Sequence, residues 1–103
     1  MPGQTAEQLM RSRYSAFVVG DADYLLRTWH PDTRPAELGL DPGMQWRRLD
    51  IISTSRGGPL DSEGVVTFAA HYRHDGERGV QRETSRFVRE DRRWYYLDAV
   101  VSG

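Results

Sequence analysis

Hydrophobic and polar residues alternate with one period in the first third of the chain and with another in the rest. In the first part, apolar residues recur every three or four positions, which is typical of a helix with one buried face. Thr5 can cap this helix, Gln8 completes a capping-box pattern, and Gly20 can end the helix in a left-handed conformation. The residues of the predicted buried face are Ala6, Leu9, Met10, Tyr14, Phe17 and Val18.

A second, shorter helix is predicted directly after Gly20. Asp21 is its expected cap, and Pro31 ends it because proline disfavours helical geometry in the residue before it, here His30. The side chains expected to point inward are Leu25, Leu26 and Trp29. A short third helical turn is predicted over 33–38, followed by a loop over 39–43.

From Trp46 onward the apolar residues alternate, which predicts strands. The expected strands cover about 46–54, 64–73, 80–89 and 94–101. Glycine-rich or charged segments separate them at 57–59, 75–79 and 90–93. The sequence therefore predicts an α+β fold with N-terminal helices packed on a curved antiparallel four-stranded sheet. A length of 103 residues suits a single domain over 1–103.

The turn at 91–92 predicts which residues of the last two strands face each other. A two-residue turn there would place Phe87 opposite Tyr96 and Ser85 opposite Asp98.

The preceding hairpin leads to the same two faces. A turn centred on Gly76-Glu77 would place Phe68 opposite Ser85. The face predicted to meet the helices carries Val66, Phe68, Ala70, Tyr72, Phe87, Trp94 and Tyr96, with Gln81, Glu83, Ser85 and Asp98 among them. The opposite, outer face is predicted to carry Val65, Thr67, Ala69, His71, Arg73, Arg82, Thr84, Arg86, Val88, Tyr95, Leu97 and Ala99.

Composition narrows the classes of function. The net charge of −1 does not favour nucleic acid or an anionic membrane as a partner, although all fourteen basic residues are arginine. The absence of cysteine removes disulfides, thiolate zinc sites and cysteine nucleophiles, and the three histidines lack a metal-ligand spacing. No apolar run is long enough to span a bilayer. We therefore expect a cytoplasmic protein without a metal or cofactor.

Three segments resemble the middle domain of the YchJ-like family. They are Met10–Phe17, Tyr24–Pro31 and Ser85–Glu90 together with Trp94-Tyr95-Tyr96. The resemblance implies a fold similar to nuclear transport factor 2 and to SnoaL-like proteins, a cone of helices on a bent sheet that often encloses a cavity. Longer members of the family carry a cysteine-rich, zinc-binding motif similar to one in SecA, and this chain has no cysteine to form it. The fold hosts several classes of function and so does not choose one.

Arg13 is the most informative candidate residue. Successive helix positions rotate by about 100°, which places Arg13 near the middle of the apolar stripe, between Leu9 and Phe17. A buried charge needs a partner or access to a cavity, and Glu83 and Asp98 are the expected partners. We favour an ion pair that locks helix to sheet over a contact with a ligand.

The candidate site follows from the predicted inner face. Its expected ligand-binding residues are Arg13, Trp29, Phe68, Tyr72, Glu83, Ser85, Phe87, Trp94, Tyr96 and Asp98. Candidates for a catalytic acid or base are Glu83 and Asp98, whose pKa burial would raise, and His30, if it faces the cavity mouth.

Three classes of function stay open. We favour a domain that binds a small molecule, or serves as an accessory module, through a cavity between helices and sheet. A cofactor-independent enzyme that transfers a proton, and a protein-interaction domain, are the alternatives. We also predict a homodimer formed through the outer face, because arginine and tyrosine are favoured at interfaces.

Overall fold

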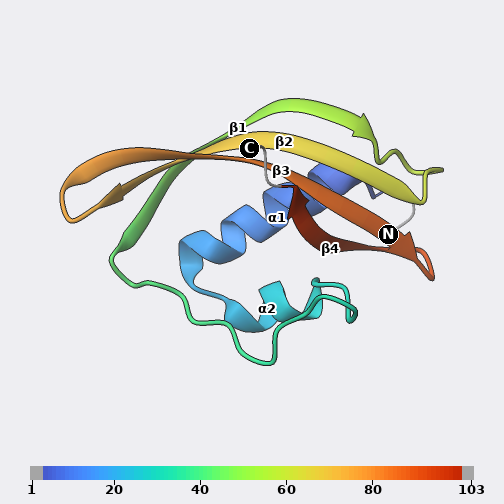
Figure 1. Ribbon diagram of the computed structural model, residues 1–103, viewed down its shortest axis with the longest axis horizontal. Helices are drawn as coiled ribbons and strands as arrows, with labels where there is room; N and C mark the ends of the chain where they lie inside the picture. Colours follow the sequence, from blue (N-terminus) through green and yellow to red (C-terminus); the bar gives the residue numbers. More distant parts are fainter. Residues whose placement is uncertain (1–3, 101–103) are drawn as a thin grey trace.

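The computed structural model describes residues 4–100 and confirms the α+β architecture. Both helices lie on the concave side of one bent sheet, and the β2–β3 hairpin projects beyond them (Figure 1). The elements are α1 (Ala6–Val19), α2 (Ala22–Arg27), β1 (Met44–Arg56), β2 (Glu63–His74), β3 (Glu77–Glu90) and β4 (Arg93–Val100). The helical turn predicted over 33–38 is absent; this segment has no regular secondary structure beyond a turn that ends at Thr33. The predicted last strand residue, Val101, lies outside the described residues.

Local signals set the limits of α1 as expected. The Thr5 hydroxyl accepts a hydrogen bond from the Gln8 amide, and the Gln8 side chain accepts one from the Thr5 amide, which completes the capping box. Gly20 ends the helix at φ 75°. The first turn docks closely on the sheet, because a Cβ atom on Gly64 would lie 2.9 Å from the Ala6 Cβ atom. Only glycine at that position permits this approach.

The segment after α2 differs from the prediction. The helix ends at Arg27, and the next residues run along the free edge of β4 instead of continuing to His30. Tyr96 donates its amide to the Thr28 carbonyl, and His30 donates its amide to the Tyr96 carbonyl, both at 2.8 Å. Pro31 favours extended geometry at His30, and the unpaired backbone groups of an edge strand need partners. Both requirements are met by this short parallel bridge.

The sheet is antiparallel with strand order β1-β2-β3-β4. The hairpin between β2 and β3 turns at Asp75-Gly76, both with positive φ, which is the geometry that an Asp-Gly pair favours. Phe68 therefore faces Glu83 and not Ser85, so the predicted register was wrong by two residues. A shift of two residues leaves every side chain on its predicted face.

The register of the hairpin between β3 and β4 places one candidate residue, Asp98, on the outer face of the sheet. The turn at 91–92 is confirmed, as is the pairing of Phe87 with Tyr96. Beyond this pair the register shifts, because Leu97 has no partner on β3 and forms a bulge. Asp98 consequently faces Arg86 on the outer side, and the prediction that it faces Ser85 on the inner side was wrong. A bulge inserts one residue and so moves the next side chain to the other face.

The core lies between α1 and the concave side of the sheet. Val66, Phe68 and Phe87 are buried there, and Trp94 closes the core beside the start of α1. Trp46, at the start of β1, packs edge-on against Tyr14. Within residues 4–100, neither helix has the length and apolar composition needed to cross a membrane.

Candidate functional site

Arg13 is buried at the centre of the helix–sheet interface, with 4% of its surface exposed. Its Nη1 atom donates to the Leu25 carbonyl at 2.7 Å and to the Thr28 hydroxyl at 2.6 Å. The guanidinium lies over the ring of Tyr96, 4.6 Å from the centroid, and 5.4 Å from the ring of Trp29. Both ring contacts are cation–π interactions, which are strongest where water is excluded.

The expected ion pair of Arg13 is absent. No carboxylate within residues 4–100 forms a salt bridge with it, so the prediction of a lock through Glu83 or Asp98 was wrong. Asp98 instead binds Arg86 on the outer face, through hydrogen bonds of 2.7 and 2.5 Å. Burial lowers the pKa of Arg13 to about 10, with nearby Tyr96 and Tyr24 acting in the opposite direction. Arg13 therefore remains a cation at neutral pH.

A pocket opens beside the Arg13 guanidinium. It has a volume of about 220 Å³ and adjoins a second hollow of about 170 Å³ with which it shares several lining residues. The pocket is lined by Met10, Arg13, Phe17, Trp29, Phe68, Gln81, Glu83, Ser85 and Tyr96. The structure thus brings six of the ten predicted ligand-binding residues together: Arg13, Trp29, Phe68, Glu83, Ser85 and Tyr96.

The other four predicted residues lie elsewhere. Phe87 is fully buried in the core, and Trp94 donates its indole nitrogen to the Gln4 carbonyl. Tyr72 packs against Trp46 and Gly79 farther along the hairpin, and Asp98 lies on the outer face. Sequence reasoning also missed pocket residues, notably Gln81, which was placed on the correct face but was not assigned to the site.

Polar groups in the pocket are unevenly satisfied. Glu83 accepts a hydrogen bond from the Gln81 side chain, and Ser85 is buried. Desolvation raises the pKa of the Tyr96 hydroxyl, nearby Glu83 adds to this shift, and Arg13 opposes it. Two buried side-chain groups find no hydrogen-bond partner within residues 4–100: the Trp29 indole nitrogen and the Tyr14 hydroxyl. Trp29 lines the pocket and Tyr14 lines the adjoining hollow.

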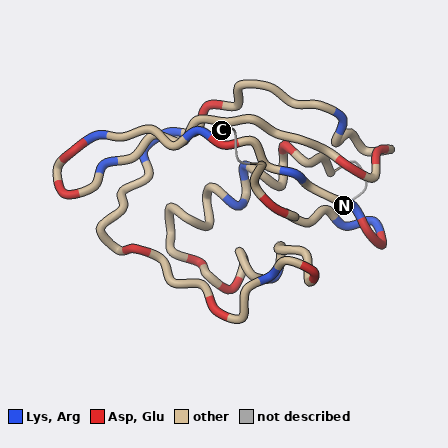
Figure 2. Tube along the Cα trace, in the orientation of Figure 1, with Lys and Arg blue, Asp and Glu red and all other residues tan. Residues whose placement is uncertain are grey.

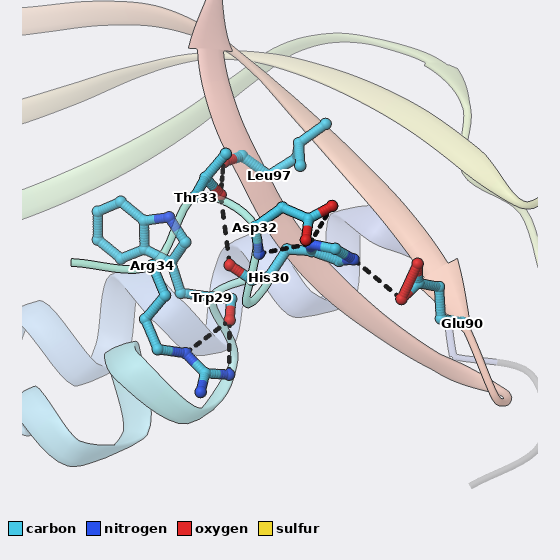
Figure 3. Close-up of polar contacts among 7 residues, drawn as sticks. All are labelled: Trp29, His30, Asp32, Thr33, Arg34, Glu90 and Leu97. Carbon is cyan, nitrogen blue, oxygen red and sulfur yellow. Dashed lines mark hydrogen bonds and ion pairs between the residues drawn. The ribbon is translucent and has the colours of Figure 1, made fainter. Parts of the chain in front are cut away.

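His30 does not line the pocket, and its ring points toward Glu90 of β3 (Figure 3). Its Nε2 atom is 2.9 Å from a Glu90 carboxylate oxygen, and its Nδ1 atom accepts the Asp32 amide at 3.1 Å. The ring is buried and packs edge-on against Tyr95. Because both ring nitrogens have partners, His30 is held in a structural contact between the bridge segment and the sheet.

The polar contacts around His30 hold the bridge segment on β4. Thr33 donates its hydroxyl to the Leu97 carbonyl at 2.6 Å, next to the bulge. Arg34 donates from two nitrogens to the Trp29 carbonyl, at 3.0 and 2.8 Å (Figure 3). These bonds position Trp29 against Tyr96, whose ring lies edge-on at 5.0 Å. Within residues 4–100, no group of three His, Asp or Glu side chains is arranged to hold a metal ion.

The helices on a bent antiparallel sheet, with a pocket between them, define a domain of the NTF2-like class. A family model described as "YchJ, middle NTF2-like domain" matches residues 5–99. The chain therefore belongs to the YchJ family, as the sequence resemblance indicated.

Relatives and solved structures support this assignment. The chain is 58% identical to a UPF0225 protein of Streptomyces coelicolor over 91% of its own length and 73% of the relative's. It is 48% identical to a UPF0225 protein of Chromobacterium violaceum over 98% of its length and 77% of the relative's. A solution structure of a SEC-C motif containing protein from Rhodopseudomonas palustris superimposes with a TM-score of 0.81 at 28% identity, covering 96% of this chain and 80% of that one.

Proposed function

We propose that the domain binds a small anionic organic molecule in the pocket between its helices and sheet. The observation that carries the proposal is Arg13, a buried cation that has no carboxylate partner within residues 4–100. Burying an unpaired charge is costly, and a bound carboxylate would supply the missing negative charge.

The hydrogen bonds of Arg13 leave part of its guanidinium available. Only Nη1 donates to acceptors within residues 4–100, at the C-terminal end of α2. A guanidinium carries five N–H donors in a planar fork that matches a carboxylate. The donors on Nε and Nη2 remain for a ligand.

The surrounding pocket favours an aromatic or apolar body on the ligand. Met10, Phe17 and Phe68 supply apolar walls, and Ser85 and Tyr96 supply polar groups. Ligand sites of this kind combine apolar walls with a few polar groups that fix orientation. The volume of about 220 Å³ is below the ~300–1,000 Å³ typical of drug-sized ligands, which favours a molecule with a single ring.

Benzoate and its neutral isostere benzamide test the proposal. Binding can be followed by tryptophan fluorescence, because Trp29 lines the pocket. We expect benzoate to bind more tightly than benzamide and Arg13→Gln to weaken benzoate by about tenfold, the loss of one charged hydrogen bond. Benzamide affinity should change far less in the same variant.

A second variant keeps the test valid if Arg13→Gln unfolds the domain. Glu83 shares the pocket and repels an anion, so Glu83→Gln should strengthen benzoate binding and leave benzamide nearly unchanged. Equal affinities for the two probes in the wild-type protein, or a Glu83→Gln variant that treats both alike, would contradict the proposal.

Proton transfer by Glu83 is a second candidate function. It is supported by one observation: Glu83 lines the same pocket as Arg13 and Tyr96, which could stabilise negative charge on a substrate oxygen. The test is deuterium exchange at the α-carbon of cyclohexanone in deuterated water, followed by proton NMR. Exchange that is faster than in buffer and is lost in Glu83→Gln would support catalysis, and exchange at the buffer rate would contradict it.

A homodimer formed through the outer face remains our proposal for the assembly. It is supported by an apolar side chain that this face leaves open, since Ile52 is 47% exposed. Sedimentation equilibrium should give the mass of a dimer, and Ile52→Glu should return the monomer without lowering the melting temperature. A monomer mass for the wild-type protein at micromolar concentration would contradict the proposal.

A further inference from the structure

Four arginines surround one hollow on the outer side of the sheet, at the end from which the β2–β3 hairpin projects. The hollow has a volume of about 430 Å³ and contains no acidic residue in its lining. Its lining residues are Arg47, Arg48, His71, Tyr72, Arg73, Arg78, Gly79 and Val80. Figure 2 shows basic positions on neighbouring strands there, with acidic positions at the tip of the hairpin.

Two of these arginines form an unfavourable cross-strand pair. Arg73 on β2 faces Arg78 on β3 directly, and Gln45 of β1 faces Arg73 from the other side. Like charges directly opposite each other destabilise a sheet. Neither Arg73 nor Arg78 forms a salt bridge with a residue in the range 4–100. The acidic turn residue Asp75 lies instead against His74, at 3.6 Å.

A bulge in β1 adds a third cation to the same place. Arg47 has no partner on β2, because the register shifts between Trp46 and Arg48. In a regular strand the consecutive residues Arg47 and Arg48 would point to opposite faces of the sheet, whereas here both line the hollow. Bulges are frequent where a strand must redirect a side chain toward a site.

The rim of the hollow is held in place by one carboxylate. Asp50 accepts from Arg48 at 3.1 Å and lies 2.9 Å from His71 Nε2. The hydrogen bond with His71, followed by the charge of Arg48, lowers the pKa of Asp50. Asp50 is thus bound to Arg48 and His71 at the rim, and Arg47, Arg73 and Arg78 form no salt bridge with any residue in the range 4–100.

From this arrangement we propose that the hollow is a binding site for a small molecule that carries a diphosphate group. Several convergent guanidinium groups fit a ligand with more than one negative charge, and arginine binds phosphate through two parallel hydrogen bonds. The volume of about 430 Å³ falls in the range of small-molecule sites. The site lies on the opposite face from the Arg13 pocket and does not depend on it.

Pyrophosphate is the probe, titrated into the full chain by calorimetry at low and moderate salt. We expect saturable one-to-one binding that Arg78→Gln weakens by about tenfold, the loss of one charged hydrogen bond. The matched control is Arg56→Gln, which removes the same charge at the far end of β1. At about 0.1 M salt its effect is screened, because the Debye length is about 10 Å.

The melting temperature is a second measurement, because the substitution that weakens pyrophosphate binding should not destabilise the ligand-free protein. Without ligand, Arg78→Gln should melt at or above the wild-type temperature, because it removes the like-charge pair with Arg73. Pyrophosphate should raise the melting temperature of the wild-type protein more than that of the variant.

Three results would overturn the proposal. One is equal weakening of pyrophosphate binding by Arg78→Gln and Arg56→Gln. The second is a lower melting temperature of ligand-free Arg78→Gln. The third is a short oligoglutamate that binds more tightly than pyrophosphate, which would assign the surface to an acidic protein partner.

Discussion

Arginine side chains on the two faces of the sheet differ in burial and in the partners that they bind. On the inner face Arg13 is buried, and its contacts are a carbonyl, a hydroxyl and two aromatic rings. On the outer face Arg86 is exposed and binds both oxygens of Asp98. A buried arginine would ordinarily be expected to pair with a carboxylate before an exposed one does. In the structure the Asp98 carboxylate pairs with the exposed Arg86, because strand register places the two opposite each other, and Arg13 has no carboxylate partner within residues 4–100.

Leu97 is the residue that separates the two faces. Because it bulges out of the β3–β4 ladder, Tyr96 and Asp98, which are two positions apart and would share a face in a regular strand, lie on opposite sides of the sheet. Tyr96 stacks under Arg13, while Asp98 turns outward to Arg86. The bulge therefore places Asp98 beside Arg86 on the outer face and away from the pocket that Tyr96 lines.

Arg13→Ala should have the largest effect on stability, with a loss of about 2–3 kcal/mol in unfolding free energy, because charged hydrogen bonds and ring contacts disappear. This loss is smaller than the ~3–5 kcal/mol expected when a buried carboxylate is left stranded. Thermal or urea unfolding measures the change. A loss at the higher value would indicate that Arg13 does pair with a carboxylate.

Strong acid should weaken the pair of Arg86 and Asp98 on the outer face. The hydrogen bond with Arg86 lowers the pKa of Asp98 in the folded state. The resulting stability is present above the unfolded pKa of about 3.9 and is lost as pH falls through the folded value. Asp98→Asn should therefore lose less melting temperature than the wild-type protein between neutral pH and about pH 3. Parallel curves for the two proteins would contradict this contribution.

Arg11→Ala should have the smallest effect on the free energy of unfolding, and it serves as a control on the same helix as Arg13. Its Nε atom binds Glu7 at 3.0 Å, one turn away, and both side chains are largely exposed. Arg11→Ala should cost about 0.3–0.5 kcal/mol, the usual value for such a pair. A loss equal to that of Arg13→Ala would mean that burial does not distinguish the two arginines.

Local chemistry in the sequence was sufficient for the elements and for much of the pocket. Thr5, Gln8 and Gly20 act within one helical turn, and alternation along the strands assigns faces wherever the ladder is regular. The position of Arg13 on the apolar stripe of α1 predicted its burial correctly. The same reasoning placed Glu83, Ser85 and Tyr96 on the inner face.

Tertiary structure decided the features that depend on contacts between distant segments. The bulge at Leu97 forms where the Thr33 hydroxyl binds the Leu97 carbonyl, a contact between residues 64 positions apart. His30 leaves the helix because β4 has a free edge to which Thr28–His30 can bind. The partners of Arg13 follow from both events, since α2 ends early and Asp98 turns away. Helix caps and strand periods act over a few residues, whereas strand register and edge pairing are properties of the assembled sheet.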